Sequence, residues 1–189
     1  MEALQEKILR EGKVLPGNVL KVNNFLNHQL DVDFLMEMGR EIARLFEHDR
    51  ISKILTIESS GIALAVAAAA QLHVPVLFAK KSSSSNMSAN KYVTRVASYT
   101  HQKVYNVVVD RAFLNEGDRV LIVDDVLACG NAMIGLMDLV KQAGAELGGV
   151  SAAIEKGYQG GGDQLRAQNI RVESLAIIDE MSEQGIRFR

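Results

Sequence analysis

The apolar residues of this chain fall into short uninterrupted runs that alternate with segments of helical spacing. Each run is typical of a strand covered on both faces, and each segment with apolar residues every three or four positions predicts an amphipathic helix. Strands alternating with helices predict an α/β fold, a parallel sheet flanked by helices on both faces. The predicted strands cover residues 51–57, 75–79, 120–123, 147–154 and 172–178, and the predicted helices cover 1–10, 31–47, 62–72, 133–142 and 163–168.

Several segments break this alternation. Residues 11–30 combine a Pro-Gly turn, a short apolar stretch and two Asn clusters, which we interpret as a small N-terminal hood beside the sheet. The serine-rich segment at about 81–91 has almost no apolar content and predicts a mobile loop. Alternating residues in 91–109 favour a β-hairpin, and the glycine-rich 157–162 predicts a loose connection.

Length and charge limit the class of protein. With 189 residues, 48% of them apolar, the chain is expected to form one domain with a full core. The formal net charge of -2 has both signs interspersed, whereas an electrostatic nucleic-acid binder usually carries a basic face. We therefore expect no nucleic-acid partner, although a local site can still hold a small anion.

The single cysteine and the N-terminus bear on location. Cys129 has no partner for an intrachain disulfide, which favours a reducing cytoplasm. The first twelve residues are charged and amphipathic, without the apolar core of a signal peptide. The longest apolar run, residues 62–70, is too short to span a bilayer, so no membrane association is expected.

The segment at 120–132, VLIVDDVLACGNA, carries the clearest chemistry. Four apolar residues predict a buried strand, and Asp124 and Asp125 follow where that strand is expected to end. Gly130 then leads into a helix, whose N-terminal N–H groups and positive dipole end suit an anion. Two carboxylates beside an anion site suit a ligand with vicinal hydroxyls and a phosphate, such as ribose 5-phosphate.

Other interpretations of this segment are weaker. An Asp-Asp pair alone is often a solvated corner after a strand, but here it combines with a small-residue loop. No Gly-Lys-Ser/Thr follows, so it is not a P-loop, and one glycine does not make a dinucleotide fingerprint. Cys129 is not expected to act as a nucleophile, because the histidines (His28, His48, His73 and His101) are scattered in the sequence.

A second strand–loop–helix unit contains Glu58-Ser59-Ser60-Gly61, whose small residues allow a close backbone approach to a ligand. An ordinary turn between a strand and a helix is the alternative. Lys80 and Lys81, in which the next predicted strand ends, can neutralise a bound anion, although paired lysines are often only a solvated edge.

The joint pattern resembles the type I phosphoribosyltransferases, whose signature is an apolar strand, two acids, two apolar residues and a small-residue loop. The resemblance extends in order along nearly the whole chain and is nearest to the members of that family that act on xanthine. The matching segments are LKVNNFLNHQLD, TIESSGIA, VLIVDDVLACGNA, VKQAGAE, AIEKGYQ and RVESLA.

The resemblance implies a single phosphoribosyltransferase domain over 1–189 and a reaction. Phosphoribosyl pyrophosphate, with Mg²⁺ brought by that substrate and no protein metal site, donates its phosphoribosyl group to xanthine. The products are xanthosine 5'-monophosphate and pyrophosphate, in purine salvage. A homodimer is implied too.

The resemblance also assigns residues. Asp124 and Asp125 hold the ribose and favour its developing positive charge. The 5-phosphate falls on the main chain of Ala128, Cys129, Gly130, Asn131 and Ala132, the pyrophosphate on Ser59, Ser60, Gly61, Lys80 and Lys81, and the purine on Leu20, Asn27 and Lys156.

Departures from the family pattern leave the identity of the purine substrate undecided. The family more often has an aromatic residue where Val126 stands, Asn at Cys129, Gln at Asn131 and Pro at Leu64. A guanine or hypoxanthine phosphoribosyltransferase is therefore the nearest alternative. A regulator that senses phosphoribosyl pyrophosphate and binds nucleic acid is a more distant one, because it generally needs a basic surface or an added module.

Overall fold

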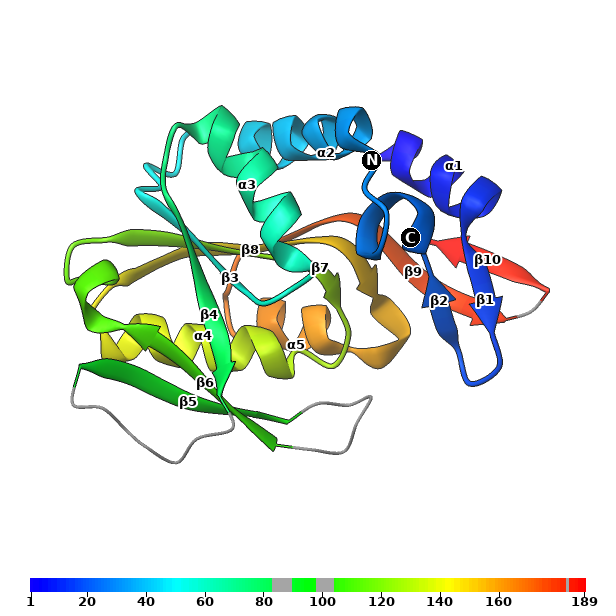
Figure 1. The fold of residues 1–189 in the computed structure, drawn as a ribbon. Helices are drawn as coiled ribbons and strands as arrows, with labels where there is room; N and C mark the ends of the chain where they lie inside the picture. Colours follow the sequence, from blue (N-terminus) through cyan, green and yellow to red (C-terminus); the bar gives the residue numbers. More distant parts are fainter. Residues whose placement is uncertain (83–89, 98–103, 183) are drawn as a thin grey trace.

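A computed structural model describes residues 1–82, 90–97, 104–182 and 184–189. Its main sheet has the strand order β10-β9-β8-β7-β3-β4-β6-β5 (Figure 1). Neighbours from β9 to β4 run parallel, whereas β10, β6 and β5 pair antiparallel, so the predicted α/β sheet is confirmed as a mostly parallel one. The strands are β3 (Lys53–Ile57), β4 (Val76–Ser82), β5 (Lys91–Ala97), β6 (Val104–Asp110), β7 (Arg119–Leu127), β8 (Glu146–Lys156), β9 (Val172–Ser182) and β10 (Gly185–Phe188).

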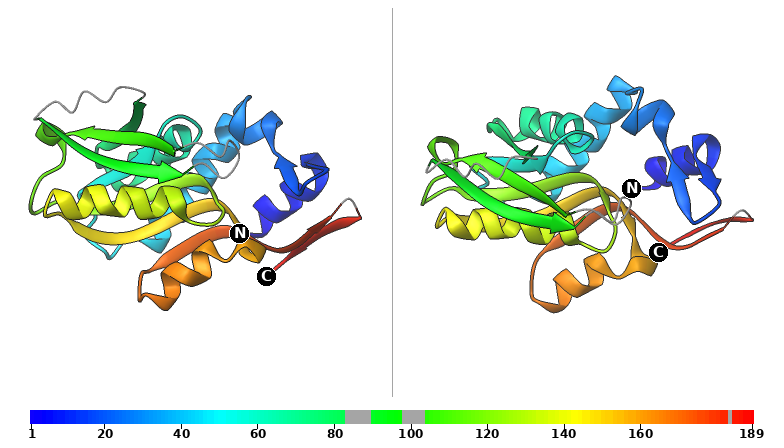
Figure 2. Two further views of the ribbon diagram at one scale, coloured as in Figure 1. Left: turned by 90° about the horizontal axis from the view of Figure 1, so that it is seen from below. Right: turned by 60° about the horizontal axis from the view of Figure 1, so that its bottom comes forward.

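Helices cover both faces of the sheet, as predicted. One face carries α1 (Glu2–Glu11), α2 (Val32–Leu45) and α3 (Gly61–Leu72), and the other carries α4 (Asn131–Gln142) and α5 (Gly161–Ala167). Seen from below, α4 and α5 lie on the near face (Figure 2). Two separate apolar clusters fill the two interfaces. Among the described residues, no helix combines the length and apolar character needed to cross a bilayer.

The hood is a small hairpin followed by one wide helical turn. Strands β1 (Lys13–Leu15) and β2 (Val19–Lys21) pair across the Pro-Gly turn, and a π-helical turn, Asn23–Asn27, follows. Phe25 and Leu26 are buried in the core cluster of α1 and α2, which attaches the hood to the sheet. Asp31 accepts a hydrogen bond from the backbone N of Phe34 (3.2 Å) and caps α2, as predicted.

Strand β7 extends further than its four apolar residues predict. It runs to Leu127, since Val126 and Leu127 still pair with Ile154 and Glu155 of β8. The expectation that the strand ends before Asp124 is therefore wrong, and both carboxylates lie within it. The alternation of a strand gives the two side chains different directions.

Strand β4 also continues past its predicted end. The sequence predicts a strand over 75–79 that ends in Lys80 and Lys81. Both lysines pair with β6, as does Ser82, so β4 runs to Ser82. The predicted hairpin at 91–109 is confirmed by the antiparallel pairing of β5 with β6. Of the expected mobile loop at about 81–91, both ends belong to strands, and residues 83–89 lie outside the described part of the chain.

The glycine-rich 157–162 is regular structure, which corrects the expectation of a loose connection. A 3-10 turn, Gly157–Gln159, leads directly into α5. A Cβ atom on Gly161 would collide with the backbone of residues 128–130, and one on Gly162 would collide with the Glu155 carboxylate. These glycines are therefore needed for close packing. Strand β10, which pairs with the end of β9, has no counterpart among the predicted strands.

Candidate functional site

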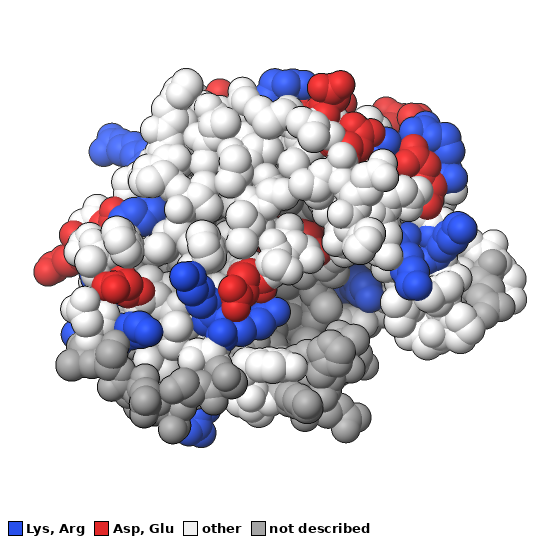
Figure 3. Space-filling model, viewed as in Figure 1, with Lys and Arg blue, Asp and Glu red and all other residues white. Residues whose placement is uncertain are grey.

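A cavity of about 430 Å³ opens where β3 and β7 end and α3 and α4 begin. This edge, at the carboxyl ends of parallel strands, is where ligands bind in open α/β sheets. Charged side chains of both signs gather beside a hollow in the face shown in Figure 3. Most of the predicted site residues line the cavity, namely Ser59, Ser60, Lys81, Asp124, Asp125, Ala128, Cys129, Gly130, Asn131 and Ala132.

The two carboxylates of β7 differ in environment. Asp124 is buried, with 6% of its surface exposed, whereas Asp125 is half-buried. Oδ1 of Asp124 accepts a hydrogen bond from the backbone N of Asp125 (3.0 Å). Burial, and then the neighbouring charge of Asp125, raise the pKa of Asp124 well above its ordinary 3.8, while Lys81 acts in the opposite direction. The pair therefore resists carrying two negative charges unless a ligand supplies donors or a cation.

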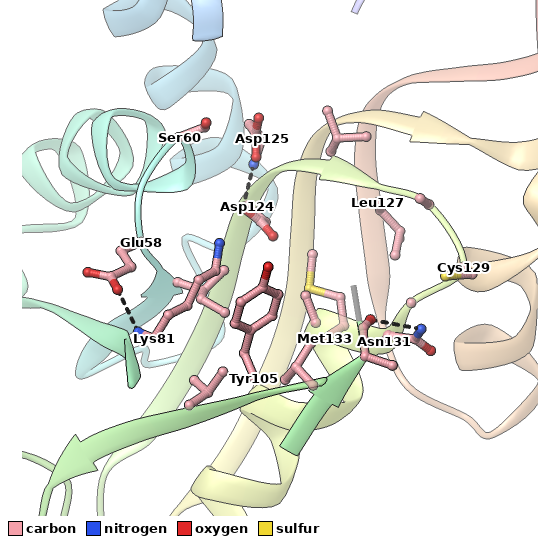
Figure 4. Close-up of a pocket in the computed structure, with 18 of the residues that line it drawn as sticks. Glu58, Ser60, Lys81, Tyr105, Asp124, Asp125, Leu127, Cys129, Asn131 and Met133 are labelled. Carbon is pink, nitrogen blue, oxygen red and sulfur yellow. Dashed lines mark hydrogen bonds between the residues drawn. The ribbon is translucent and has the colours of Figure 1, made fainter. Parts of the chain in front are cut away.

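The loop after β7 ends in an anion-binding geometry. Gly130 has φ +85°, a left-handed conformation that favours glycine, and α4 begins at the next residue. The side chain of Asn131 donates to the carbonyl of Ala97 (3.2 Å), which ties the start of α4 to β5 (Figure 4). The first N–H groups of a helix lack intrahelical acceptors, so this end of the cavity presents donors to an anion.

On the opposite side, the loop after β3 brings a second helix N-terminus to the cavity. The peptide bond between Glu58 and Ser59 is cis, and α3 begins at Gly61. Glu58 accepts a hydrogen bond from the backbone N of Lys81 (2.6 Å), which joins this loop to β4. Gly61 does not line the cavity, but its backbone packs against Asp124.

The two lysines of β4 point in different directions, because successive side chains of a strand alternate. Lys81 lines the cavity, and its side chain extends toward Asp124 and Tyr105 in Figure 4. Lys80 does not line it; its Nζ lies 5.7 Å from the ring centre of Phe78. The structure thus brings one of the two predicted lysines to the site.

The three residues expected at the purine lie around the hood, outside the lining of this cavity. Lys156 ends β8, and its Nζ donates to the carbonyl of Asn18 in the hood turn (3.5 Å). Burial lowers the pKa of Lys156. Leu20 is half-buried in β2, and Asn27 is exposed at the end of the π-helical turn.

The β5–β6 hairpin supplies a wall of the cavity that sequence reasoning missed. Val96, Ala97, Tyr105 and Val107 line it, together with Met133 of α4. The alternation in residues 104–109 predicts the strand, but no local signal shows that the hairpin folds back toward the carboxylates. Tyr105, which lies between Lys81 and Met133 in Figure 4, is the polar residue among them.

The described part of the chain contains no group of three or more His, Cys, Asp or Glu side chains placed to hold a metal ion. Asp124 and Asp125 nevertheless offer carboxylate oxygens at the cavity. Hard cations such as Mg²⁺ prefer oxygen ligands and keep several waters. The oxygens of these two carboxylates therefore fit a Mg²⁺ ion that is coordinated mainly by a bound ligand.

The sequence matches the family described as phosphoribosyl transferase domain over residues 23–184. The chain belongs to the phosphoribosyltransferase family. Xanthine phosphoribosyltransferase 1 of Clostridium perfringens is 53% identical to it over 190 residues, covering 100% of both chains. The xanthine phosphoribosyltransferase of Lachnoclostridium phytofermentans is 50% identical and covers 96% of this chain and 94% of its own.

Solved structures of the family share the fold. The adenine phosphoribosyltransferase of Giardia lamblia, complexed with 9-deazaadenine, has a TM-score of 0.73 at 20% identity, covering 89% of this chain and 92% of its own. That of Leishmania tarentolae has a TM-score of 0.74 at 16% identity, covering 96% and 90%. At such identities the likeness concerns architecture, the type I phosphoribosyltransferase fold.

Proposed function

We propose that this protein transfers the 5-phosphoribosyl group of phosphoribosyl pyrophosphate to xanthine, giving xanthosine 5'-monophosphate and pyrophosphate. The observation that carries the proposal is the cavity that places Asp124 and Asp125 between two helix N-termini, those of α3 and α4. Two anion sites with carboxylates between them match a sugar that carries one phosphate and one pyrophosphate. The full-length relatives of 50% identity or more are named for xanthine.

In this proposal the loop after β7 holds the 5-phosphate. The backbone N–H groups from Ala128 to Ala132 lie at the cavity and include the first turn of α4. Since backbone groups make the contacts, the side chains of Cys129 and Asn131 can differ from the family pattern. The thiol of Cys129 has no role in the transfer.

The pyrophosphate lies on the other side, against Ser59, Ser60 and the N-terminus of α3. Gly61 allows this turn to approach β7 closely. Lys81 is the cation at the cavity that neutralises the leaving group. Lys80 acts with it only if the ligand-bound β4 turns its side chain, because here Lys80 points away.

Asp124 and Asp125 accept hydrogen bonds from the ribose 2- and 3-hydroxyls. When the bond from C1 of the ribose to the pyrophosphate oxygen breaks, positive charge develops on the ring, and fixed carboxylates stabilise it. The base nitrogen then forms the new bond to C1, and its proton passes to the released pyrophosphate. A cavity that excludes water protects the activated sugar from hydrolysis.

Lys156 is the residue proposed to select the base, together with Leu20 and Asn27 of the hood. An ammonium group donates to the oxo groups of a purine, and xanthine has one more of these than hypoxanthine. A site whose buried donor is left unpaired rejects the wrong base strongly. Nζ of Lys156 donates to the carbonyl of Asn18, and this contact between the lysine and the hood supports a shared role in holding the base.

Mg²⁺ enters as part of the substrate, chelated by phosphoribosyl pyrophosphate. The ion offsets the charge of the pyrophosphate and of the carboxylates, which is consistent with the raised pKa of Asp124.

We also propose that the chain forms one domain and acts as a homodimer in the cytoplasm. Leu9 of α1 and Val19 of the hood are exposed by 58% and 44%, so each of these segments has an apolar side chain available to a second copy. The single cysteine is compatible with a reducing compartment.

The test is to incubate the protein with phosphoribosyl pyrophosphate, Mg²⁺ and xanthine and to identify the products by mass. The proposal expects xanthosine 5'-monophosphate and pyrophosphate in equal amounts, and none when Mg²⁺ is chelated. Consumption of phosphoribosyl pyrophosphate with guanine or hypoxanthine alone would favour the related purine enzymes. Salt-dependent DNA binding without turnover would favour the regulator.

A further inference from the structure

The start of α5 lies directly against the loop proposed to hold the 5-phosphate. A Cβ atom on Gly161 would collide with the carbonyl oxygen of Ala128 and would stand 2.6 Å from the backbone N of Gly130. The two backbones therefore touch with no side chain between them. Any displacement of α5 toward the loop moves the N–H groups of that loop.

A buried carboxylate holds α5 in this place. Glu155, near the end of β8, is completely buried. Arg166 of α5 donates to it in a fork, Nη1 to Oε1 at 2.8 Å and Nη2 to Oε2 at 2.7 Å. Ser174 of β9 donates to Oε2 at 2.5 Å. The two planar groups match in geometry, so the pair fixes orientation as well as distance.

The same carboxylate lies under the first turn of α5. A Cβ atom on Gly162 would collide with Oε1 of Glu155 and would stand 2.8 Å from Oε2. The last turn of α5 is thus bound by Arg166, and the first turn rests on Glu155 beside Gly161. The ion pair thus fixes the position of Gly161, the glycine whose backbone contacts the loop.

A merely stabilising role explains this arrangement less well. Taking a carboxylate out of water is costly even when it is paired, and apolar residues of similar volume often stabilise a core as well or better. Here Glu155 requires a glycine at position 162, and the adjacent Gly161 abuts the loop. A buried, paired charge thus lies where α5 contacts the loop.

We infer that Glu155 and Arg166 are positioning residues that set the phosphate loop, residues 128–132, by seating α5 beneath it. They touch no substrate, so their effect is on affinity for the phosphate-bearing substrate. The inference rests on the proposed function, because it assigns the loop to the 5-phosphate. It adds a structural determinant in residues 155–166, outside the loop itself.

The test compares Arg166→Gln with Arg187→Gln, which removes an arginine from the exposed ion pair with Glu180. Amide hydrogen exchange is followed by mass spectrometry in residues 126–133 and, as an internal reference, in β3. Losing a hydrogen bond to a charged group is expected to speed exchange in the loop about tenfold in Arg166→Gln, with β3 unchanged. Arg187→Gln leaves both segments as they are.

Kinetics supply the second measurement. Arg166→Gln is expected to raise KM for phosphoribosyl pyrophosphate about tenfold and KM for xanthine less than about twofold. Arg166→Lys keeps the charge but loses the two-pronged hydrogen bonding of the guanidinium. Its KM for phosphoribosyl pyrophosphate should therefore lie between that of the unmodified protein and that of Arg166→Gln. Equal acceleration of exchange in β3 and the loop, or an unchanged KM for phosphoribosyl pyrophosphate, would overturn the inference. Absence of turnover with every purine would instead refute the proposed function, and hydrogen exchange would still decide the positioning role.

Discussion

A Cβ atom on Gly61 would lie 2.5 Å from Oδ1 of Asp124, so the first turn of α3 and the carboxylate of β7 touch with no side chain between them. The same Cβ atom would lie 2.5 Å from Oγ1 of Thr56, a buried hydroxyl of β3. The turn proposed for the pyrophosphate and the acid proposed for the ribose are thus fixed relative to each other by direct packing.

Gly61→Ala is therefore expected to damage the site and the fold together. Because Asp124 and Thr56 are both buried, neither can move away freely, and overpacking of this kind costs about 1–3 kcal/mol. Thermal unfolding and turnover measure the two effects. Val66→Ala, on the exposed side of α3, is the control and should change the free energy of unfolding by less than about 0.5 kcal/mol. A fully active Gly61→Ala protein would contradict the close packing.

Asp125→Asn tests the proposed stabilisation of positive charge on the ribose. The amide keeps the shape of the side chain but loses the charge, and removing one preorganised electrostatic group costs about 10²–10³ in kcat. Steady-state kinetics measure this loss. Asp33→Asn, at an exposed position of α2, is the matched control and should remain fully active. Equal rates for the two variants would remove Asp125 from the proposed mechanism.

The raised pKa of Asp124 has a consequence for stability. Between the ordinary pKa of 3.8 and the raised one, the folded protein binds more protons than the unfolded chain. The stabilising contribution of Asp124 to the free energy of unfolding is therefore fully present below pH 3.8 and is lost as pH rises through the raised pKa. Asp125, which adds repulsion, and Lys81, which opposes it, are the charges that face the group.

Asp124→Asn removes the loss of stability that ionising this buried carboxyl causes, because an amide does not ionise. We expect the melting temperature of the variant to exceed that of the unmodified protein by an amount that grows as pH rises above 3.8 and through the raised pKa. Melting curves without ligand, measured at each pH for both proteins, give the difference. A difference that is constant with pH, or that shrinks as pH rises, would show that the folded protein does not raise this pKa.

Lys156→Gln tests the proposed selection of the base. Loss of a hydrogen bond from a charged donor costs about 1.5–3 kcal/mol, which corresponds to roughly 10- to 100-fold in kcat/KM for xanthine. KM for phosphoribosyl pyrophosphate should change little. The exposed hood lysine supplies the control, Lys21→Gln. An unchanged kcat/KM for xanthine would exclude Lys156 as the base contact.

Much of the fold follows from local patterns. The helical spacing predicts α2, α3 and α4 close to their observed bounds. The apolar runs predict that β3, β7, β8 and β9 exist, although β7 and β9 extend beyond their predicted ends. The carboxylates and the glycine loop lie together because the carboxyl ends of parallel strands share one edge of the sheet. This part of the site is therefore predictable from the sequence.

The rest depends on contacts distant in sequence. Lys80 and Lys81 read as a strand end, yet pairing with β6 extends β4 through them and turns only Lys81 into the cavity. The glycine-rich sequence around Gly161 predicts a flexible segment, although close contact with the backbone around Ala128 determines its position. Tyr105 reaches the site because its hairpin folds back. These contacts join segments that are distant in sequence, so local sequence patterns do not predict them.

The specificity constant for xanthine tests the central proposal most directly. The protein is assayed for pyrophosphate release with phosphoribosyl pyrophosphate, Mg²⁺ and each of xanthine, guanine, hypoxanthine and adenine. We predict that kcat/KM is highest for xanthine. No release with any of the four bases, or a preference for a base that lacks the second oxo group of xanthine, would contradict it.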